Sequence, residues 1–220
     1  MHPINKNLPP PSLSLLLYLK ESGHDLFQLS LEELWDRLRG GLILSDKENA
    51  PTKLFWMDGG PDSNFLLLPK ALTINTDSFG NQGPQHGQDS VKLGGNVITV
   101  PTVKYNKTRY VRVSGKLGWV GLSPSGAYKV VLYLKLNQRA TEEIRFATMT
   151  RLSSPDGTQT RVPWSFGNKK ASEKWDEFPV GTFQMKPNNV GELSFEIHVY
   201  FWGRPDITIK GVDVIKIPPP

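Results

Sequence analysis

From residue 51 onward the chain is a succession of short apolar runs that turn residues separate, with no helical stretch between them. Each run is rich in the β-branched and aromatic residues that strands favour. The ten runs read "KLFWMD", "FLLLPKALTI", "GNVITV", "RYVRVSGKL", "YKVVLYLKL", "EEIRFATM", "RVPWSF", "KWDEFPVGTF", "ELSFEIHVYFW" and "ITIKGVDVIKI". Because parallel strands need a long crossover, usually a helix, this order predicts antiparallel pairing. We therefore expect a mainly β fold, an antiparallel jelly-roll β-sandwich with a short N-terminal helical segment.

Two of the runs predict which face of the sandwich is buried. Successive side chains of a strand point to opposite faces, and residues 128–136 and 192–202 both alternate clearly. In the second run the apolar set is Leu193, Phe195, Ile197, Val199 and Phe201, and the opposite set is Ser194, Glu196, His198, Tyr200 and Trp202. We expect the first set to face the core and the second to face solvent or a ligand. In the last run the apolar phase shifts after Gly211, which predicts a β-bulge.

A helical segment precedes the strands. In "LSLEELWDRLRGG" (29–41), Ser30 and Glu33 have the capping-box spacing, and two glycines end the helix. Its apolar stripe consists of Leu31, Leu34, Trp35 and Leu38. Such a stripe has to be buried, so we expect the helix to dock on the β domain. The predicted organisation is a flexible Pro-rich lead-in at 1–11, a docked helical segment at 12–50 and a jelly-roll domain at 51–220.

The residue patterns of common enzymes and metal sites are missing from the sequence. There is no cysteine, none of the four histidines is paired at a metal-ligand spacing, and neither a G-x-S-x-G nor a Walker motif occurs. We therefore expect a protein that is not an enzyme and uses no metal or other cofactor.

The sequence also predicts a cytoplasmic protein. No apolar run approaches the length of a membrane span. The apolar stretch "LSLLLYL" (13–19) follows three prolines and lacks a basic leader, so we interpret it as the start of an amphipathic helix rather than a signal peptide.

Aromatic residues are the remaining functional candidates, with six Trp, six Tyr and ten Phe. Trp56, Trp164 and Trp175 lie inside strand-like runs, where core packing is the expected role. Trp119 and Trp202 stand at strand ends, so we expect them to be exposed. An exposed aromatic ring can stack on the apolar face of a sugar or on a nucleobase.

A basic zone is the other feature of the charge pattern. Between residues 90 and 141 there are nine Lys or Arg and no Asp or Glu. One interpretation is a solvated sheet face. The other is a basic strip at 92–139 that binds a polyanion such as RNA, with phosphates contacted by Lys104, Lys107, Arg109 and Arg112.

The order of several stretches resembles the phloem protein 2 family of plant lectins, which is related to the jasmonate-induced tobacco lectin. The matching stretches are "LEELWDRLRGGLIL", "LFWMD", "NFLLLPKALTI", "VRVSGKL", "LSPSGAYKVVLYLKL", "EKWDEFPVGTF", "GELSFEI" and "IKGVDVIKI", and they cover roughly residues 30–217. The resemblance implies a cucurbit-type lectin of the phloem sieve element with a jelly-roll lectin domain. It implies binding of N-acetylglucosamine oligosaccharides, as free chitooligosaccharides or on glycoproteins, without metal or catalysis, and a homodimer. It also implies RNA binding by some members.

The sequence departs from the family at the loop "NTDSFGNQGPQHGQD" (75–89), where Thr76 stands in place of a tryptophan. We expect sugar recognition to use aromatic stacking and loop hydrogen bonds around this position. The candidate sugar-binding residues are Thr76, Asp77, Phe79, Asn81, His86, Tyr200, Trp202 and Asp206. The alternatives are the RNA-binding protein described above and a structural phloem protein with weakened sugar binding.

Overall fold

The computed structural model describes residues 10–58, 63–77, 83–137, 143–170 and 174–218. Two α-helices, α1 (Leu13–Glu21) and α2 (Leu31–Arg39), precede the strands. The strands are β1 (Leu42–Ser45), β2 (Pro51–Met57), β3 (Ser63–Leu67), β4 (Thr73–Thr76), β5 (Gln85–Leu93), β6 (Asn96–Tyr105), β7 (Tyr110–Gly118), β8 (Ala127–Asn137), β9 (Glu143–Ser153), β10 (Gln159–Lys170), β11 (Asp176–Gln184), β12 (Glu192–Phe201) and β13 (Asp206–Lys216). Two short 3₁₀ turns, η1 (Pro69–Ala71) and η2 (Trp119–Gly121), complete the described elements.

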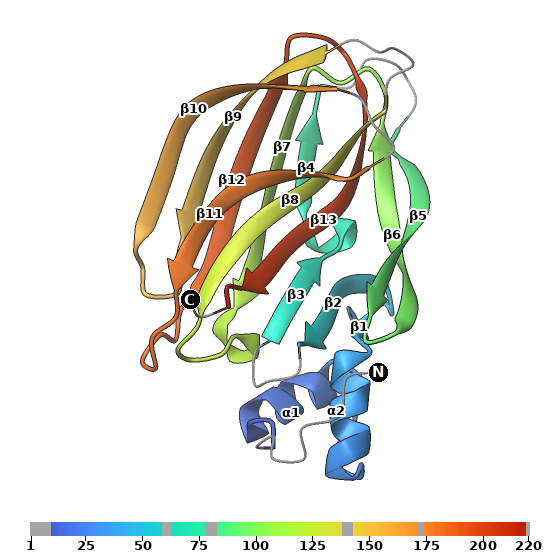
Figure 1. Cartoon of the computed structure of the whole chain (residues 1–220), viewed down its shortest axis with the longest axis vertical. Helices are drawn as coiled ribbons and strands as arrows, with labels where there is room; N and C mark the ends of the chain where they lie inside the picture. Colours follow the sequence, from blue (N-terminus) through green and yellow to red (C-terminus); the bar gives the residue numbers. More distant parts are fainter. Residues whose placement is uncertain (1–9, 59–62, 78–82, 138–142, 171–173, 219–220) are drawn as a thin grey trace.

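The strands form two antiparallel sheets packed face to face, as the alternating pattern predicted (Figure 1). The five-stranded sheet has the order β10-β9-β12-β7-β4. The eight-stranded sheet runs β1-β2-β3-β13-β6-β5, with β8 also paired to β13 and β11 paired to β8. Every strand pair is antiparallel. The prediction of a mainly β, antiparallel sandwich with a short helical segment is confirmed.

The main core lies between the sheets and continues under the helices. The predicted inward set of β12 is buried, and Leu19 and Leu38 bring the two helices into the same cluster. The capping box of Ser30 and Glu33 is present at the start of α2. The predicted stripe of α2 is wrong at one residue, because Leu31 is 45% exposed whereas Leu34, Trp35 and Leu38 are buried. Figure 1 shows both helices at one end of the sandwich, beside β1 and β2.

A second, smaller core lies on the other side of β2 and β3. Its buried members are Leu54, Trp56, Leu66, Leu68 and Val100, so these two strands are covered on both faces. The cover comes from the β5–β6 hairpin, whose Val91, Leu93 and Ile98 pack against this cluster. Burial on both faces explains why "NFLLL" is a continuous apolar run rather than an alternating one.

Three predicted boundaries differ from the structure. The run "FLLLPKALTI" is not one strand, because η1 begins at Pro69 and carries the chain from β3 in one sheet to β4 in the other. Proline lacks the backbone N–H that a central strand needs, which accounts for the break. Residues 85–89, expected in a loop, begin β5 and pair with β6. The sheet itself begins at Leu42, inside the segment expected to be helical.

The predicted bulge in β13 is confirmed. The pairing of β13 with β8 shifts register between Ile209 and Gly211. Gly211 has a φ of +155°, and a Cβ at this position would lie 2.2 Å from the carbonyl oxygen of Leu67. Glycine is therefore required where β13 passes β3. Neither described helix is long and apolar enough to span a membrane.

Candidate functional site

The outer face of the five-stranded sheet gathers the aromatic and hydrogen-bonding side chains that the alternation of β12 predicted to be outward. Because Leu193, Phe195 and Ile197 are buried in the core, the alternate residues of β12 point away from it. The register sets Tyr200 opposite Tyr110 on β7 and Ala147 on β9, and it sets His198 opposite Arg112 and Met149. Each row across this face therefore mixes residues from three strands.

An aromatic cluster occupies one end of this face. Trp202 is 52% exposed and stands edge-on to Tyr200, with 5.6 Å between the ring centroids. Phe166 on β10 is 73% exposed, and its ring centroid lies 5.9 Å from that of Trp202. Ala147 separates Phe166 from Tyr200 in the register, so a small side chain lies between two large rings. Exposed rings in this arrangement offer flat apolar surface to a stacking ligand.

A hydrogen-bonded network lies beside the cluster. The Tyr110 hydroxyl lies 2.6 Å from His198 Nδ1, and His198 Nε2 lies 2.5 Å from Glu196 Oε1. Arg112 Nε donates to Glu196 Oε2 at 3.0 Å. The hydrogen bond from His198 holds the pKa of Glu196 below its usual value, and the Arg112 guanidinium adds to this effect. The network fixes a phenol, an imidazole and a carboxylate on one surface.

The network supports hydrogen bonding rather than nucleophilic chemistry. Burial raises the pKa of Tyr110 above its usual value near 10, so its hydroxyl stays protonated at neutral pH. A protonated phenol donates and accepts hydrogen bonds but is a weak nucleophile. Both ring nitrogens of His198 thus have a partner, Nδ1 with the Tyr110 hydroxyl and Nε2 with the Glu196 carboxylate.

The other end of the same face is hollowed. A depression of about 370 Å³ is lined by hydroxyl groups and charged groups of β4, β7, β9 and β12. Its lining includes Thr73, Ser114, Lys116, Arg151, Ser153, Ser194 and Glu196. Small-ligand sites begin at roughly this size. The face therefore combines an aromatic end with a polar, concave end.

Of the predicted sugar-binding residues, the structure brings Tyr200 and Trp202 together. Phe79 and Asn81 lie outside the described residues. Thr76 ends β4, and Asp77 follows it with Oδ1 accepting from the backbone N–H groups of Arg109 at 2.9 Å and Tyr110 at 2.7 Å. That carboxylate oxygen thus joins the end of β4 to the start of β7.

The remaining two predicted sugar-binding residues lie in the other sheet. His86 is exposed on β5, opposite Val103 of β6. Asp206 begins β13, where it accepts from Lys107 N at 3.0 Å and forms an ion pair with Lys104 at 3.4 Å. Asp206 therefore has a structural role at the β6–β7 turn.

The aromatic cluster and network contain residues that sequence reasoning missed. Phe166 lies in "RVPWSF", where Pro163 interrupts the alternation and the β9–β10 register shifts between Val162 and Ser165, so no face could be assigned. Trp164, expected in the core, is 46% exposed. Trp56 is buried, Trp119 and Trp202 are exposed as expected, and Trp175 is half-buried between Lys135 and Lys210.

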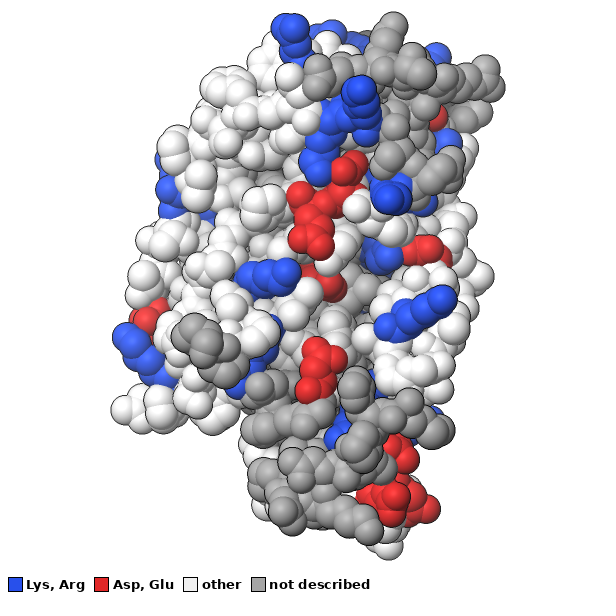
Figure 2. All heavy atoms as spheres, in the orientation of Figure 1, with Lys and Arg blue, Asp and Glu red and all other residues white. Residues whose placement is uncertain are grey.

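The basic zone does not map onto one strip. Arg112 and Lys116 lie on β7 of the five-stranded sheet, whereas Lys92, Lys104 and Lys135 lie on strands of the eight-stranded sheet. Arg112 is paired with Glu196, and Lys104 with Asp206. On the face shown in Figure 2, Asp and Glu side chains lie near the centre and Lys and Arg side chains lie around them. The described part of the zone is thus divided between surfaces and partly neutralised.

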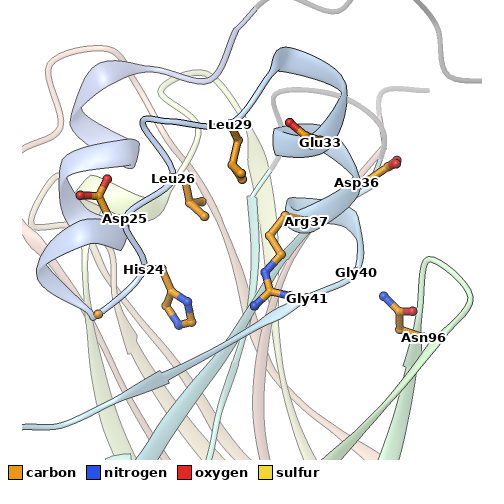
Figure 3. A pocket seen from close by; sticks show the side chains of 11 residues that line it. His24, Asp25, Leu26, Leu29, Glu33, Asp36, Arg37, Gly40, Gly41 and Asn96 are labelled. Carbon is orange, nitrogen blue, oxygen red and sulfur yellow. The ribbon is translucent and has the colours of Figure 1, made fainter.

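A second hollow, of about 680 Å³, lies where the helices meet the tip of the β5–β6 hairpin (Figure 3). Leu26 and Leu29 line its inside, and Asn96 approaches Gly40 from the hairpin. Two of its charged residues have local roles, because Asp25 is paired with Lys20 at 3.0 Å and Glu33 belongs to the capping box. Within the described ranges no group of three or more His, Asp or Glu side chains could hold a metal ion.

Comparison with known proteins gives a likeness of fold alone. No family model matches the chain, and no curated protein matches it. Among solved structures, the carbohydrate-binding module TmCBM61, determined in complex with β-1,4-galactotriose, has 12% identity and a TM-score of 0.37 over 66% of this chain and 88% of that chain.

Two further solved structures show the same level of likeness. The enzymatically active domain of tailspike protein 4 of bacteriophage CBA120 has 11% identity and a TM-score of 0.37 over 67% of this chain and 19% of that chain. The C-terminal family 22 carbohydrate-binding module of Clostridium thermocellum Xyn10B has 9% identity and a TM-score of 0.34 over 67% of this chain and 86% of that chain. At these values the likeness carries no argument about function.

Proposed function

We propose that this protein binds carbohydrate, without catalysis, on the outer face of its five-stranded sheet. The observation that carries the proposal is the exposed cluster of Phe166, Tyr200 and Trp202 beside an ordered polar network. Sugar rings have apolar C–H faces and hydroxyl edges, so a ligand of this kind uses both parts of the surface. Sites for small ligands commonly combine apolar walls with a few fixed polar groups.

In this proposal each part of the face has a separate task. A pyranose ring stacks on Trp202, with Phe166 extending the apolar surface. The Tyr110 hydroxyl, held in place by His198, and the Glu196 carboxylate, further along β12, orient the oligosaccharide by hydrogen bonds to its hydroxyl groups. Because these groups are already hydrogen-bonded to one another, little side-chain entropy is lost on binding.

We propose N-acetylglucosamine oligomers as the ligand, on the strength of the resemblance to the phloem protein 2 lectins. Loop 75–89 carries no tryptophan, so in this chain the stacking role falls to Trp202 and Phe166 rather than to the loop. Pairing of two copies would raise the avidity of a site that holds only one or two rings. The homodimer and the cytoplasmic location stay predictions. RNA binding is not carried forward, because the described basic residues lie on separate surfaces.

The proposal predicts that truncating the aromatic cluster removes sugar binding. Calorimetry with chitotriose should show saturable binding for the unmodified protein and a loss of about tenfold or more, ~1.4 kcal/mol, for Trp202→Ala and for Phe166→Ala. Phe27→Ala is the matched control, because Phe27 is an exposed phenylalanine beside the helices, at the other end of the molecule. Equal affinity of all three variants for chitotriose would show that the site is elsewhere, and no saturable heat at millimolar sugar would rule out the ligand.

A further inference from the structure

Two arginines face each other on the outer face of the five-stranded sheet. Arg151 on β9 is directly opposite Arg161 on β10, and on its other side it is opposite Glu196 of β12. Both arginines are exposed. Like charges directly opposite one another destabilise a sheet, and such positions usually carry opposite charges. The contact between the two arginines is therefore unfavourable, and Glu196 is a favourable neighbour of Arg151 alone.

The nearby carboxylates of the described chain are engaged elsewhere. Glu196 uses one oxygen for His198 and the other for Arg112, and Glu192 is paired with Lys116 at 2.8 Å. Arg161 Nη2 lies 3.4 Å from Met149 Sδ, which is a weak and neutral acceptor. Neither Arg151 nor Arg161 forms an ion pair with a described residue. Arg151, which lines the hollow, and Arg161, its neighbour on β10, thus lack a direct ion pair within the described chain.

The hollow beside Arg151 has the chemistry of an anion site. Ser153 and Ser194 lie opposite each other and, with Ser114, line the hollow with hydroxyl groups. Lys116 lies at its other side, and the Glu196 carboxylate, which also lines the hollow, is engaged by Arg112 and His198. Hydroxyl donors between cations suit a small acidic group, because guanidinium groups bind carboxylate and sulfate oxygens through paired hydrogen bonds.

We propose that Arg151 and Arg161 form a subsite for one acidic substituent of an oligosaccharide, a uronate carboxylate or a sulfate ester. This inference rests on the proposed sugar-binding function. Glu196, at the hollow, is four residues from Tyr200 along β12, so about 13 Å separates the acidic subsite from the aromatic cluster. An oligosaccharide along β12 could occupy both. The carboxylates of Glu192 and Glu196 lie beside the hollow and repel a continuous polyphosphate, so the surface favours a ligand with an isolated acidic group over RNA.

The test uses inorganic sulfate, which represents the acidic group alone, and then oligosaccharides with and without an acidic group. Inorganic sulfate, added at constant ionic strength against chloride, is followed by the amide NMR shifts of Arg151, Ser153 and Ser194. Calorimetry then compares neutral chitotriose with trigalacturonate and with sulfated chitotriose. The variants are Arg151→Gln and Arg161→Gln, with Lys92→Gln as control, because Lys92 is an exposed cation on β5 of the other sheet and its loss changes the net charge equally.

We expect sulfate to shift these amides, and at least one acidic oligosaccharide to bind tenfold or more tightly than chitotriose. Both effects should disappear in Arg151→Gln and persist in Lys92→Gln, whereas binding of chitotriose should not change. Whichever acidic oligosaccharide binds more tightly identifies the acidic group.

Four results would overturn the inference, each in a distinguishable way. If chitotriose binds and neither acidic ligand binds more tightly, the subsite is wrong but the proposed function stands. If sulfate binds and no oligosaccharide does, the proposed sugar-binding function is wrong, and so is the acidic oligosaccharide as the ligand of the arginine pair. Equal losses in Arg151→Gln and Lys92→Gln would indicate diffuse attraction between charges. Tighter binding of single-stranded RNA, also lost in Arg151→Gln, would assign the pair to a phosphate backbone.

Discussion

Among single residues, Asp213 stands out because it is a carboxyl group buried within the sheet. It lies on β13 between Leu66 of β3 and Val131 of β8, and it is buried. Burial raises the pKa of Asp213 to about 7, although the Lys210 charge and a hydrogen bond from Tyr133 act in the opposite direction. A carboxyl group with this pKa makes the stability of the protein depend on pH near neutrality.

The sign of this dependence follows from the direction of the shift. Between the ordinary pKa of 3.8 and about 7, the folded protein keeps a proton that the unfolded chain releases. The free energy of unfolding therefore falls as the pH rises through this range. Above pH 7 the protein has lost all of the stability that ionisation of buried Asp213 removes. Asp213→Asn should make the protein more stable at pH 8, by on the order of a few kcal/mol, and change it little at pH 4.

Urea unfolding at pH 4 and pH 8 checks this prediction. Asp36→Asn is the control, because Asp36 is an exposed carboxylate on α2. The prediction is wrong if the free energy of unfolding of Asp213→Asn drops between pH 4 and pH 8 as much as that of the unmodified protein.

Among the elements, the sequence predicted strands best where a long run alternates between buried and outward residues. The alternation of β12 gave its core face correctly, and the phase shift after Gly211 located the bulge. Two strands went unrecognised: β1, and β5, whose first residues, "QHGQ", are exposed and polar. Such residues form a strand because β6 pairs with them, which is information that lies outside the segment.

The bulge in β13 gives the prediction at this scale. Gly211→Ala should destabilise the protein by more than about 2 kcal/mol, because the new Cβ would overlap the carbonyl oxygen of Leu67 and force β13 away from β3. Gly203→Ala is the matched control, since nothing lies within 4 Å of a Cβ at that position. Chemical denaturation of the two variants provides the comparison, and equal midpoints would mean that β3 and β13 tolerate a wider separation than the structure shows.

At the scale of the whole molecule, the sequence predicted the layers but only part of the candidate site. Tyr200 and Trp202 were found because they share a sequence run, 192–202, with a clear period of two. Phe166, Tyr110 and Arg151 come from three other strands, and only the register across β7, β9, β10 and β12 brings them onto one face. Register is set by long-range pairing and turn geometry, so a single sequence does not reveal which residues become neighbours.

The resemblance directed attention to loop 75–89, whereas the described structure directs it to the sheet face. Asp77 is engaged by the backbone of β7, and His86 lies on the other sheet. We therefore propose that sugar binds on the outer face of the five-stranded sheet, at the cluster of Phe166, Tyr200 and Trp202.

Titration of the ¹⁵N-labelled protein with chitotriose, followed by amide and indole NMR shifts, distinguishes this face from the other surfaces of the molecule. We expect the largest shifts at the Trp202 indole and at the amides of Phe166, Tyr200 and His198, with little change on the β5–β6 hairpin. Shifts confined to the hairpin or to residues 23–41, with the Trp202 indole unmoved at saturation, would contradict the proposal.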